Sequence, residues 1–336
     1  MNYKVLLLLV AILNTNLFSQ SKFPTHYIPD RTYSGQSIFD IINVPVEKID
    51  IGLWSIIISK EFDNSIDVNY YLNKLDEMVV EINRMLAGRT RDFDKFGLTR
   101  MFIYDSGIWN NNQPFQYDLD DPLGHNLSTQ LLSTYIDTRK GNCVSMPTLF
   151  LALMERVDPN VIFRPSLAPL HLFCRFRDRQ TGDVWNVEAT NQGSPARNQW
   201  YIERMNISQL AIDKQSYLSD LTKKEFIAEL INILASKSRE DKQYKKALKY
   251  TELALKLSPN SLSALVQKGS LLAWIGYEKS QKEKLEKEEM KKLHDESEKY
   301  IKKAIELGWQ ERTKEAEEKY LKEVNEEKHK INSKSN

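Results

Sequence analysis

The sequence predicts an α+β domain followed by an all-α helical domain. Two alternating apolar runs in residues 169–191 flank a short polar turn, which is typical of an antiparallel hairpin. Apolar residues recur at helical spacing in residues 67–86, so helices accompany the sheet. From about Leu221 the composition changes to Lys, Glu, Leu and Ala, which favours helices. We therefore expect the α+β domain in residues 21–215 and the helical domain in residues 221–330.

Length and composition agree with this organisation. The chain has 336 residues, enough for about two domains, and its hydrophobic content of 41% suffices for ordinary cores. The net charge is +1, so charge gives no reason to expect a nucleic-acid partner. We expect residues 331–336 to form a disordered tail.

Residues 1–20 have the pattern of a secretory signal peptide. Lys4 precedes the apolar run Val5–Leu13, and polar residues ending in Ser19 and Gln20 follow it. The run is shorter than the ~20 residues that a membrane-spanning helix needs. We therefore expect a periplasmic or secreted protein with no membrane span after signal removal. A buried N-terminal strand is the alternative.

The first half of the α+β domain should be helical with one polar interruption. Val46–Lys60 is a buried segment whose helix or strand type the pattern alone leaves open. Asp67–Leu86 is a clear helix, with Asp63 or Ser65 as its cap. Arg89–Thr99 is polar and basic, which predicts a loop or short turn.

A further helix, Asn126–Thr138, leads into the cysteine-containing loop. Three acids before it, Asp118, Asp120 and Asp121, raise the possibility of a calcium site. The segment lacks the glycine and the distal Glu of an EF-hand loop, so a capping turn is the preferred interpretation. We expect His125 to be a surface or cap residue because no strand or acid partner is evident for it.

The cysteine of that loop is the leading candidate for catalysis. Gly141 stands two residues before Cys143, and an apolar run at helical spacing follows from Thr148. Pro147 is acceptable only in the first turn of a helix, so the helix should begin near Ser145, a possible N-cap. A thiol just before a helix start feels the positive end of the helix dipole, which favours the nucleophilic thiolate.

A base and an acid follow in an order that suits this nucleophile. His171 opens one strand-like run, and Glu188 lies in the next, after a turn at residues 181–183. If the two runs pair, His171 and Glu188 come near each other, and Cys143, His171 and Glu188 form a catalytic set. The alternative for His171 is a strand-end histidine that binds a backbone carbonyl.

The second cysteine, Cys174, leaves two further alternatives. A disulfide between Cys143 and Cys174 would suit an oxidising compartment. Strand alternation opposes it, because His171 and Cys174 point to opposite faces of their strand. A zinc site on His171 and Cys174 lacks a second pair of ligands. We expect Cys174 to be a small buried hydrophobic residue.

Three local motifs together resemble the SirB1 family of the transglutaminase-like (papain-like) superfamily. The motifs are Arg139-Lys140-Gly141-Asn142-Cys143-Val144-Ser145, Pro169-Leu170-His171-Leu172-Phe173 and Glu188-Ala189-Thr190. Weaker likenesses cover Leu53–Ser59, Leu72–Asp76 and Tyr117–Pro122. The resemblance spans residues 53–193.

This resemblance implies both a fold and a set of roles. The fold is a transglutaminase-like core of helices and an antiparallel sheet, with the 46–60 segment helical. Cys143 is the nucleophile, His171 the base and Glu188 the orienting acid, at a position where the superfamily usually has Asp. Asn142 and Asn191 are candidate oxyanion or substrate contacts. No metal or other cofactor is implied.

An internal repeat in the second half resembles the tetratricopeptide family. Ala247, Thr251, Ala254 and Pro259 have the spacing of that repeat's second helix, after a first helix at about residues 225–237. The spacing recurs weakly about fifty residues later, with a charged insert of about sixteen residues between Tyr277 and Leu293. A plain helical array is the alternative. Two repeats bury little, so they must dock on the first domain, pair with another chain or pack on a last helix at about residues 311–327.

We therefore expect a secreted or periplasmic cysteine enzyme that transfers acyl groups. Its substrate would be a protein or peptide amide or ester, and its helical repeats would bind a protein partner. The main alternative is a transglutaminase-like scaffold with an idle site that acts only through the repeats. A structural disulfide, making the domain a scaffold, is the third possibility.

Overall fold

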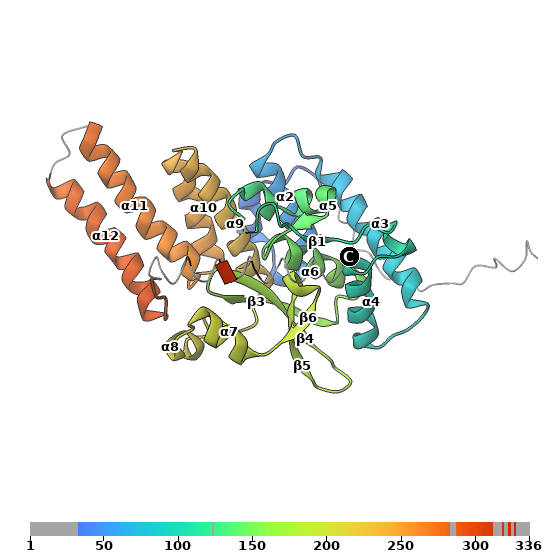
Figure 1. Ribbon diagram of the computed structural model, residues 1–336. Coiled ribbons are helices and arrows are strands. Elements are labelled where there is room, and N and C mark those ends of the chain that lie inside the picture. The colour runs from blue at the N-terminus through green and yellow to red at the C-terminus, as the bar shows by residue number, and fades with distance from the viewer. Residues whose placement is uncertain are drawn as a thin grey trace, which may run out of the picture. The chain divides into compact units, whose positions relative to one another are not determined.

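The computed structural model describes residues 33–122, 124–282 and 287–311, together with residues 318, 322, 323 and 326. The expected signal peptide at 1–20 and the expected tail at 331–336 lie outside these residues, as does most of the expected last helix. The described chain combines helices with a small antiparallel sheet and one short parallel strand pair (Figure 1). The predicted α+β class is confirmed at this level.

A four-stranded antiparallel sheet forms the β part of the fold. Its strands, in the spatial order in which they pair, are β3 (Ile162–Ala168), β4 (His171–Arg177), β5 (Val184–Glu188) and β6 (Ser194–Ala196). The sequence pattern does not predict β3, because Pro165 lies within it. Pro165 is tolerated because β3 is an edge strand, where a missing N–H leaves no gap in the ladder.

Helices form a second layer, in which α6 (Ser145–Val157) packs on one face of the sheet. They are α2 (Ile51–Phe62), α3 (Val68–Leu86), α4 (Asp92–Tyr104), α5 (Leu132–Thr138) and α6 (Ser145–Val157), with the short 3-10 helices η1 (Ile38–Asn43), η2 (Val46–Lys48), η3 (Ile108–Asn110), η4 (Leu127–Gln130) and η5 (Ala189–Asn191). The α6 helix is buried almost all round, because α2, α3, α4 and α5 surround it and the sheet lies beneath it (Figure 1). The residues that follow Cys143 are therefore the centre of the core.

The two faces of the sheet belong to different cores. Cys174 and Phe176 of β4 join the large core around α6, whereas Phe173 joins a smaller core with Tyr201. Tyr201 lies on α7 (Asn198–Met205), which is followed by α8 (Gln209–Asp213). The predicted alternation along β4, with Cys174 facing away from the His171 side, is thus confirmed.

Two local predictions need correction. The cap of α3 is Asp67, whose carboxylate accepts a hydrogen bond from the Tyr70 N–H at 3.2 Å, and not Asp63 or Ser65. Because α3 begins at Val68, the residue just before it, Asp67, is the one whose side chain reaches the N–H groups of the first turn. The predicted helix at 126–138 is two elements, the 3-10 helix η4 and the α-helix α5, separated by Leu131.

The loop predicted at Arg89–Thr99 is wrong, because α4 occupies most of it. Two charged residues of α4 are buried because they form ion pairs inside the fold, so the apolar pattern of a helix is interrupted there. Asp92 is fully buried and accepts two 2.6 Å hydrogen bonds from Arg179. Lys95 is buried as well, and its Nζ lies 2.6 Å from Asp158. A periodicity argument counts such residues as exposed, so it cannot detect this face.

The second half consists of paired helices, as predicted. They are α9 (Lys223–Glu240), α10 (Tyr244–Leu257), α11 (Leu262–Lys282) and α12 (Lys287–Glu306). Small residues mark close helix crossings. A Cβ on Gly269 of α11 would lie 2.8 Å from the Ile301 side chain of α12. The charged insert expected between Tyr277 and Leu293 belongs mostly to α11 and α12, which extend through most of it.

These helices dock on the first part of the chain. Side chains of α9 and α10 share the large core with α2 and α6. Lys223 at the start of α9 pairs with Glu155 of α6, and Tyr250 of α10 donates a hydrogen bond to Glu61 of α2. Of the three arrangements considered for the repeats, the described residues show docking. The linking segment also pairs with β3, since Leu218 N–H donates to Leu167 O at 2.9 Å.

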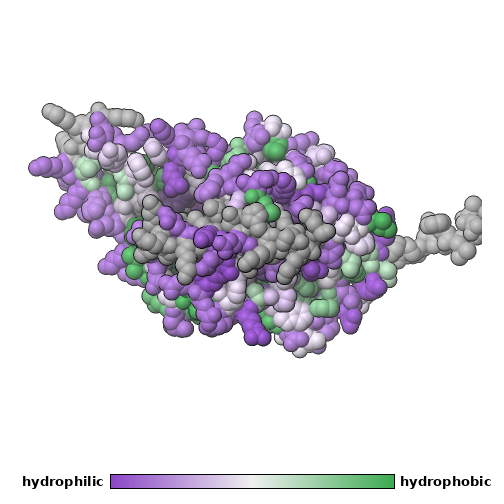
Figure 2. Space-filling model, viewed as in Figure 1, coloured by the Kyte–Doolittle hydropathy of each residue, from purple (hydrophilic) through white to green (hydrophobic). Residues whose placement is uncertain are grey.

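The surface is mostly polar where it can be seen. Among the described residues on the face in Figure 2, hydrophilic side chains dominate and the hydrophobic ones lie scattered. Within the described residues, every helix is too short or too polar to cross a bilayer.

Candidate active site

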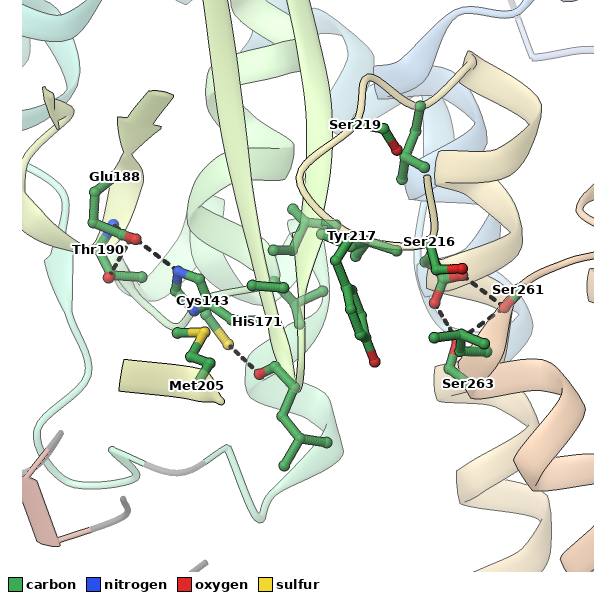
Figure 3. Close-up of a pocket in the computed structure, with 18 of the residues that line it drawn as sticks. Cys143, His171, Glu188, Thr190, Met205, Ser216, Tyr217, Ser219, Ser261 and Ser263 are labelled. Atoms are coloured by element: carbon green, nitrogen blue, oxygen red, sulfur yellow. Dashed lines mark hydrogen bonds and ion pairs between the residues drawn. The ribbon is translucent and has the colours of Figure 1, made fainter. Parts of the chain in front are cut away.

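Three elements bring Cys143, His171 and Glu188 together. Cys143 lies two residues before α6, His171 is the first residue of β4, and Glu188 is the last residue of β5 (Figure 3). Because β4 and β5 are antiparallel neighbours, the start of one strand meets the end of the other. His171 and Glu188 are thus joined by a 2.7 Å hydrogen bond between Nε2 and Oε2.

The cysteine loop is held by its own side chains. The Asn142 Oδ1 atom accepts hydrogen bonds from the N–H groups of Val144, at 3.0 Å, and Ser145, at 3.3 Å. Its Nδ2 donates to Thr129 Oγ1 at 3.0 Å. Asn142 therefore caps α6, the role that the sequence analysis gave to Ser145. In this structure the Asn142 side chain is buried in the cap, so it acts as a positioning residue for Cys143.

The short parallel pair anchors the other side of this loop. Strand β1 (Gln116–Tyr117) pairs with β2 (Lys140–Gly141), immediately before Asn142. The three acids that follow β1 have separate tasks. Asp118 Oδ1 accepts from the Asp120 N–H, Asp120 pairs with Lys140, and Asp121 accepts from the N–H of His125. They act as turn and cap residues around the cysteine loop.

Gly141 is required by close packing against the loop. A Cβ at this position would lie 2.5 Å from the Tyr135 ring and 2.7 Å from Ser145 Oγ. We expect Gly141→Ala to lower the free energy of unfolding by about 1–3 kcal/mol, as overpacking does, and to slow alkylation of Cys143. Urea unfolding and alkylation rates measure both effects. Gly97→Ala in α4 is the matched control, because its Cβ meets nothing within 4 Å. Equal stability and equal labelling of the two variants would refute this account.

Glu188 is surrounded by donors. Oε2 accepts from His171 and, at 3.0 Å, from the Tyr201 hydroxyl. Oε1 accepts from the Thr190 N–H at 3.1 Å and from its hydroxyl at 2.6 Å. Four donors on two oxygens fit an ionised carboxylate, which only accepts. The sequence analysis missed Tyr201, which lies outside the three motifs and has no local signal.

The charges around His171 favour the imidazolium. Burial of the ring opposes protonation, but the Glu188 carboxylate and a hydrogen bond with the Cys143 side chain outweigh it. Together they raise the pKa of His171 from an ordinary 6.5 to about 10. The Nε2 atom binds Glu188, so Nδ1 is the nitrogen left for the thiol. The ring also stacks on Phe173, with centroids 6.5 Å apart.

The turn before His171 is strained. Pro169 and Leu170 join β3 to β4, whose register pairs Ala168 with His171. Leu170 adopts a left-handed conformation with φ of 58°, which is unfavourable for a residue with a Cβ. Its carbonyl oxygen lies 3.9 Å from the Cys143 Sγ atom. The tight turn therefore places the histidine and the thiol against each other.

The alternatives built on Cys174 do not fit this geometry. Both cysteines are free thiols. Cys174 is fully buried in the large core, 3.9 Å from the Pro147 carbonyl oxygen, and its burial raises the pKa of the thiol. The disulfide alternative is therefore not realised. Since Cys174 faces away from His171, the pair also does not form half of a metal site.

These side chains line a cavity of about 1170 Å³. Cys143, His171 and Glu188 lie on its wall, as do the predicted Asn191 and His125. The opposite wall comes from α9 and the α10–α11 connection, with Tyr217 between the two sides (Figure 3). Asn191 thus remains available as a substrate contact, and His125 is an exposed residue of the same rim. Comparison with protein-family models, curated proteins and solved structures finds no match for this chain.

Proposed function

We propose that the protein is a cysteine-dependent acyl-transfer enzyme acting on amide or ester bonds of proteins or peptides. One observation carries this proposal. His171 contacts the thiol of Cys143 on one side and the carboxylate of Glu188 on the other, inside a cavity and beside the start of a buried helix. That arrangement supplies a nucleophile, a base and an orienting acid, the three parts that nucleophilic catalysis needs.

The chemistry would proceed in two halves. The Cys143 thiolate attacks the carbonyl carbon, and a C–S bond forms as the carbonyl electrons move to oxygen. The tetrahedral species collapses and expels the amine or alcohol, which takes a proton from the His171 imidazolium. Water or an amine then attacks the thioester, gives a proton to His171 and displaces the thiolate. The products are an acid or a new amide, and the site returns to its starting state.

The surroundings support both the ion pair and the oxyanion. Glu188 stabilises the imidazolium and, with Tyr201, fixes the ring orientation. The backbone N–H of Cys143 lies next to the α6 N-terminus, where it can donate to an oxyanion. Gln130 lines the same cavity and uses its Nε2 atom for one hydrogen bond, to Gly124 O at 3.1 Å. Its second N–H makes Gln130 a candidate for the other oxyanion donor.

The finer assignments belong to the same proposal. The SirB1-like motifs support a transglutaminase-like core, and the helix pairs α9–α10 and α11–α12 support tetratricopeptide-like repeats that bind a protein partner. The sequence pattern of residues 1–20 supports a secreted or periplasmic location.

The pH dependence of Cys143 alkylation tests the proposal. Iodoacetamide labelling of the wild type should show an apparent pKa well below the ~8.5 of a free thiol. The low value should disappear in His171→Ala, because the imidazolium no longer stabilises the thiolate. It should persist in Cys174→Ser, which alters only the buried thiol. Mass spectrometry of the labelled peptide assigns the reaction to Cys143.

An ordinary thiol pKa that is indifferent to His171 would overturn the enzyme proposal. The protein would then be an idle scaffold, and the helical repeats would be its working part. A low pKa that depends on His171 would justify a screen of peptide amides and amines as substrates.

A further inference from the structure

The cavity has a second polar site, opposite the catalytic residues. Glu229 projects from α9, and its Oε1 atom accepts a 2.7 Å hydrogen bond from Ser261 Oγ. Its Oε2 atom accepts from Ser263 Oγ and, at 3.4 Å, from Asn232 Nδ2. Figure 3 shows Ser261 and Ser263 on the side of the cavity away from Cys143. We call Glu229, Asn232, Ser261 and Ser263 the acceptor cluster.

This cluster has more acceptors than donors. A serine hydroxyl has a single proton, and Ser261 and Ser263 both direct it to Glu229. Asn232 uses its amide group to donate to Ser263 Oγ at 3.0 Å and to Glu229. Its Oδ1 atom is buried and accepts no hydrogen bond within the described residues. A buried acceptor without a donor is costly, so the site is incomplete as it stands.

Glu229 also lacks a counter-charge. Within the described part of the chain, none of its hydrogen bonds or ion pairs involves Lys, Arg or His. Burial therefore dominates and raises the pKa of Glu229, with Ser263, Ser261 and Asn232 opposing that rise. Of the other acids on the cavity wall, Glu203 accepts a 2.6 Å hydrogen bond from Gln199 Nε2. Asp220 pairs with Arg175, and Glu225 accepts the Thr222 N–H as part of the α9 cap.

We propose that the acceptor cluster binds the ammonium or guanidinium group of a basic side chain in a peptide substrate, while Cys143 attacks an acyl group of the same peptide. The inference rests on the proposed function for the second half of that statement. Such a cation brings several N–H donors, which would serve the Glu229 carboxylate in the cavity wall. Its charge would also offset the partial burial of the Glu229 carboxylate, which lacks a cationic partner within the described residues.

The size of the cavity favours a peptide over a small molecule. Its volume of about 1170 Å³ exceeds the ~300–1,000 Å³ typical of small-ligand pockets. The catalytic residues and the acceptor cluster lie on opposing walls, with Tyr217 between them. One extended segment would reach both, and the helical part of the chain would then select the substrate that the first part modifies.

Affinity labelling of Cys143 tests this assignment in the full chain. The probes are chloroacetyl-(Ala)n-Lys-amide peptides with n from one to five, and matched peptides with norleucine in place of Lys. Each reaction forms a C–S bond to Cys143 and releases chloride. For at least one spacer, the Lys peptide should label about tenfold faster or more, since a hydrogen bond to a charged group contributes about that much. The ratio of the Lys to the norleucine rate should fall to near one in Glu229→Gln.

The control keeps the comparison specific to the site. Glu240→Gln removes an exposed carboxylate from the same helix, outside the cavity, and should leave the ratio unchanged. Thermal unfolding verifies that both variants fold. A ratio near one at every spacer in the wild type, or a ratio that survives Glu229→Gln, overturns the inference.

The Lys to norleucine ratio tests the cation site independently of the proposed enzyme function. If Cys143 is an ordinary thiol, every labelling rate falls but the Lys to norleucine ratio is still measured. A high ratio with a slow thiol would support the cation site and refute the enzyme. A fast thiol with a ratio near one would do the opposite.

Discussion

Glu188→Gln is expected to lower the pKa of His171 well below its value of about 10. The carboxylate is the strongest influence that favours the imidazolium, whereas burial opposes it. A carboxamide also cannot accept on both of its ends, so either the His171 and Tyr201 donors or the two Thr190 donors lose their acceptor. Imidazole NMR titration of the labelled protein measures the pKa directly.

The thiol should respond to the same substitution. Without the imidazolium, Cys143 loses the positive charge that favours the thiolate, which is its nucleophilic form. We therefore expect alkylation at pH 7 to slow by about tenfold or more in Glu188→Gln. Thr190→Val is the matched control, because it removes a hydrogen bond from Oε1 but keeps the charge. If the control slows as much as Glu188→Gln, the carboxylate charge is not the cause.

Stability should follow the same titration. The folded-state pKa of His171 is raised, so the stabilisation that it provides is fully present below pH 6.5 and is lost as the pH rises through about 10. The stability difference between wild type and Glu188→Gln should therefore shrink between these values. Urea unfolding at several pH values measures it. A difference that grows towards pH 10 would contradict the assigned imidazolium.

Arg156→Met is expected to cost about 3–5 kcal/mol of unfolding free energy, because it removes the guanidinium that pairs with a buried carboxylate. Arg156 is almost wholly buried on α6, and its Nη2 atom lies 2.9 Å from Asp50 at the N-cap of α2. Its Nε atom lies 3.3 Å from Asp76 of α3. The guanidinium thus joins three helices at the end of α6 opposite Cys143. Urea unfolding of the full chain measures the loss.

Arg91→Met provides the matched comparison. Arg91 forms a 2.8 Å ion pair with Asp94, but its side chain is 69% exposed. Exposed pairs contribute little to stability, because water screens the charges and replaces the contact. Equal losses in the two variants would show that burial of the Arg156 pair is not what makes it strong. A loss below about 1 kcal/mol for Arg156→Met would show that the Arg156 guanidinium does not hold the three helices together.

Helix α4 and strand β3 differ from the sequence prediction for a common reason. Asp92, Lys95 and Pro165 break the helix and strand patterns that would have indicated these two elements. Each is accommodated by a partner or position distant in sequence. Asp92 and Lys95 find Arg179 and Asp158, and Pro165 lies at a sheet edge. Single-sequence periodicity contains no information about such partners.

The candidate site also combines features that local sequence patterns predict with contacts that only the folded chain forms. Cys143 before a helix, and His171 and Glu188 on consecutive strands, are local patterns that the sequence determined by itself, because helix starts and hairpins depend on neighbouring residues. Only the tertiary structure decided that Thr129 holds the Asn142 amide and that Tyr201 holds Glu188. It alone brought α9, with Glu229, across the cavity from the thiol. These contacts join segments that are far apart along the chain, and packing of the shared core sets their distances.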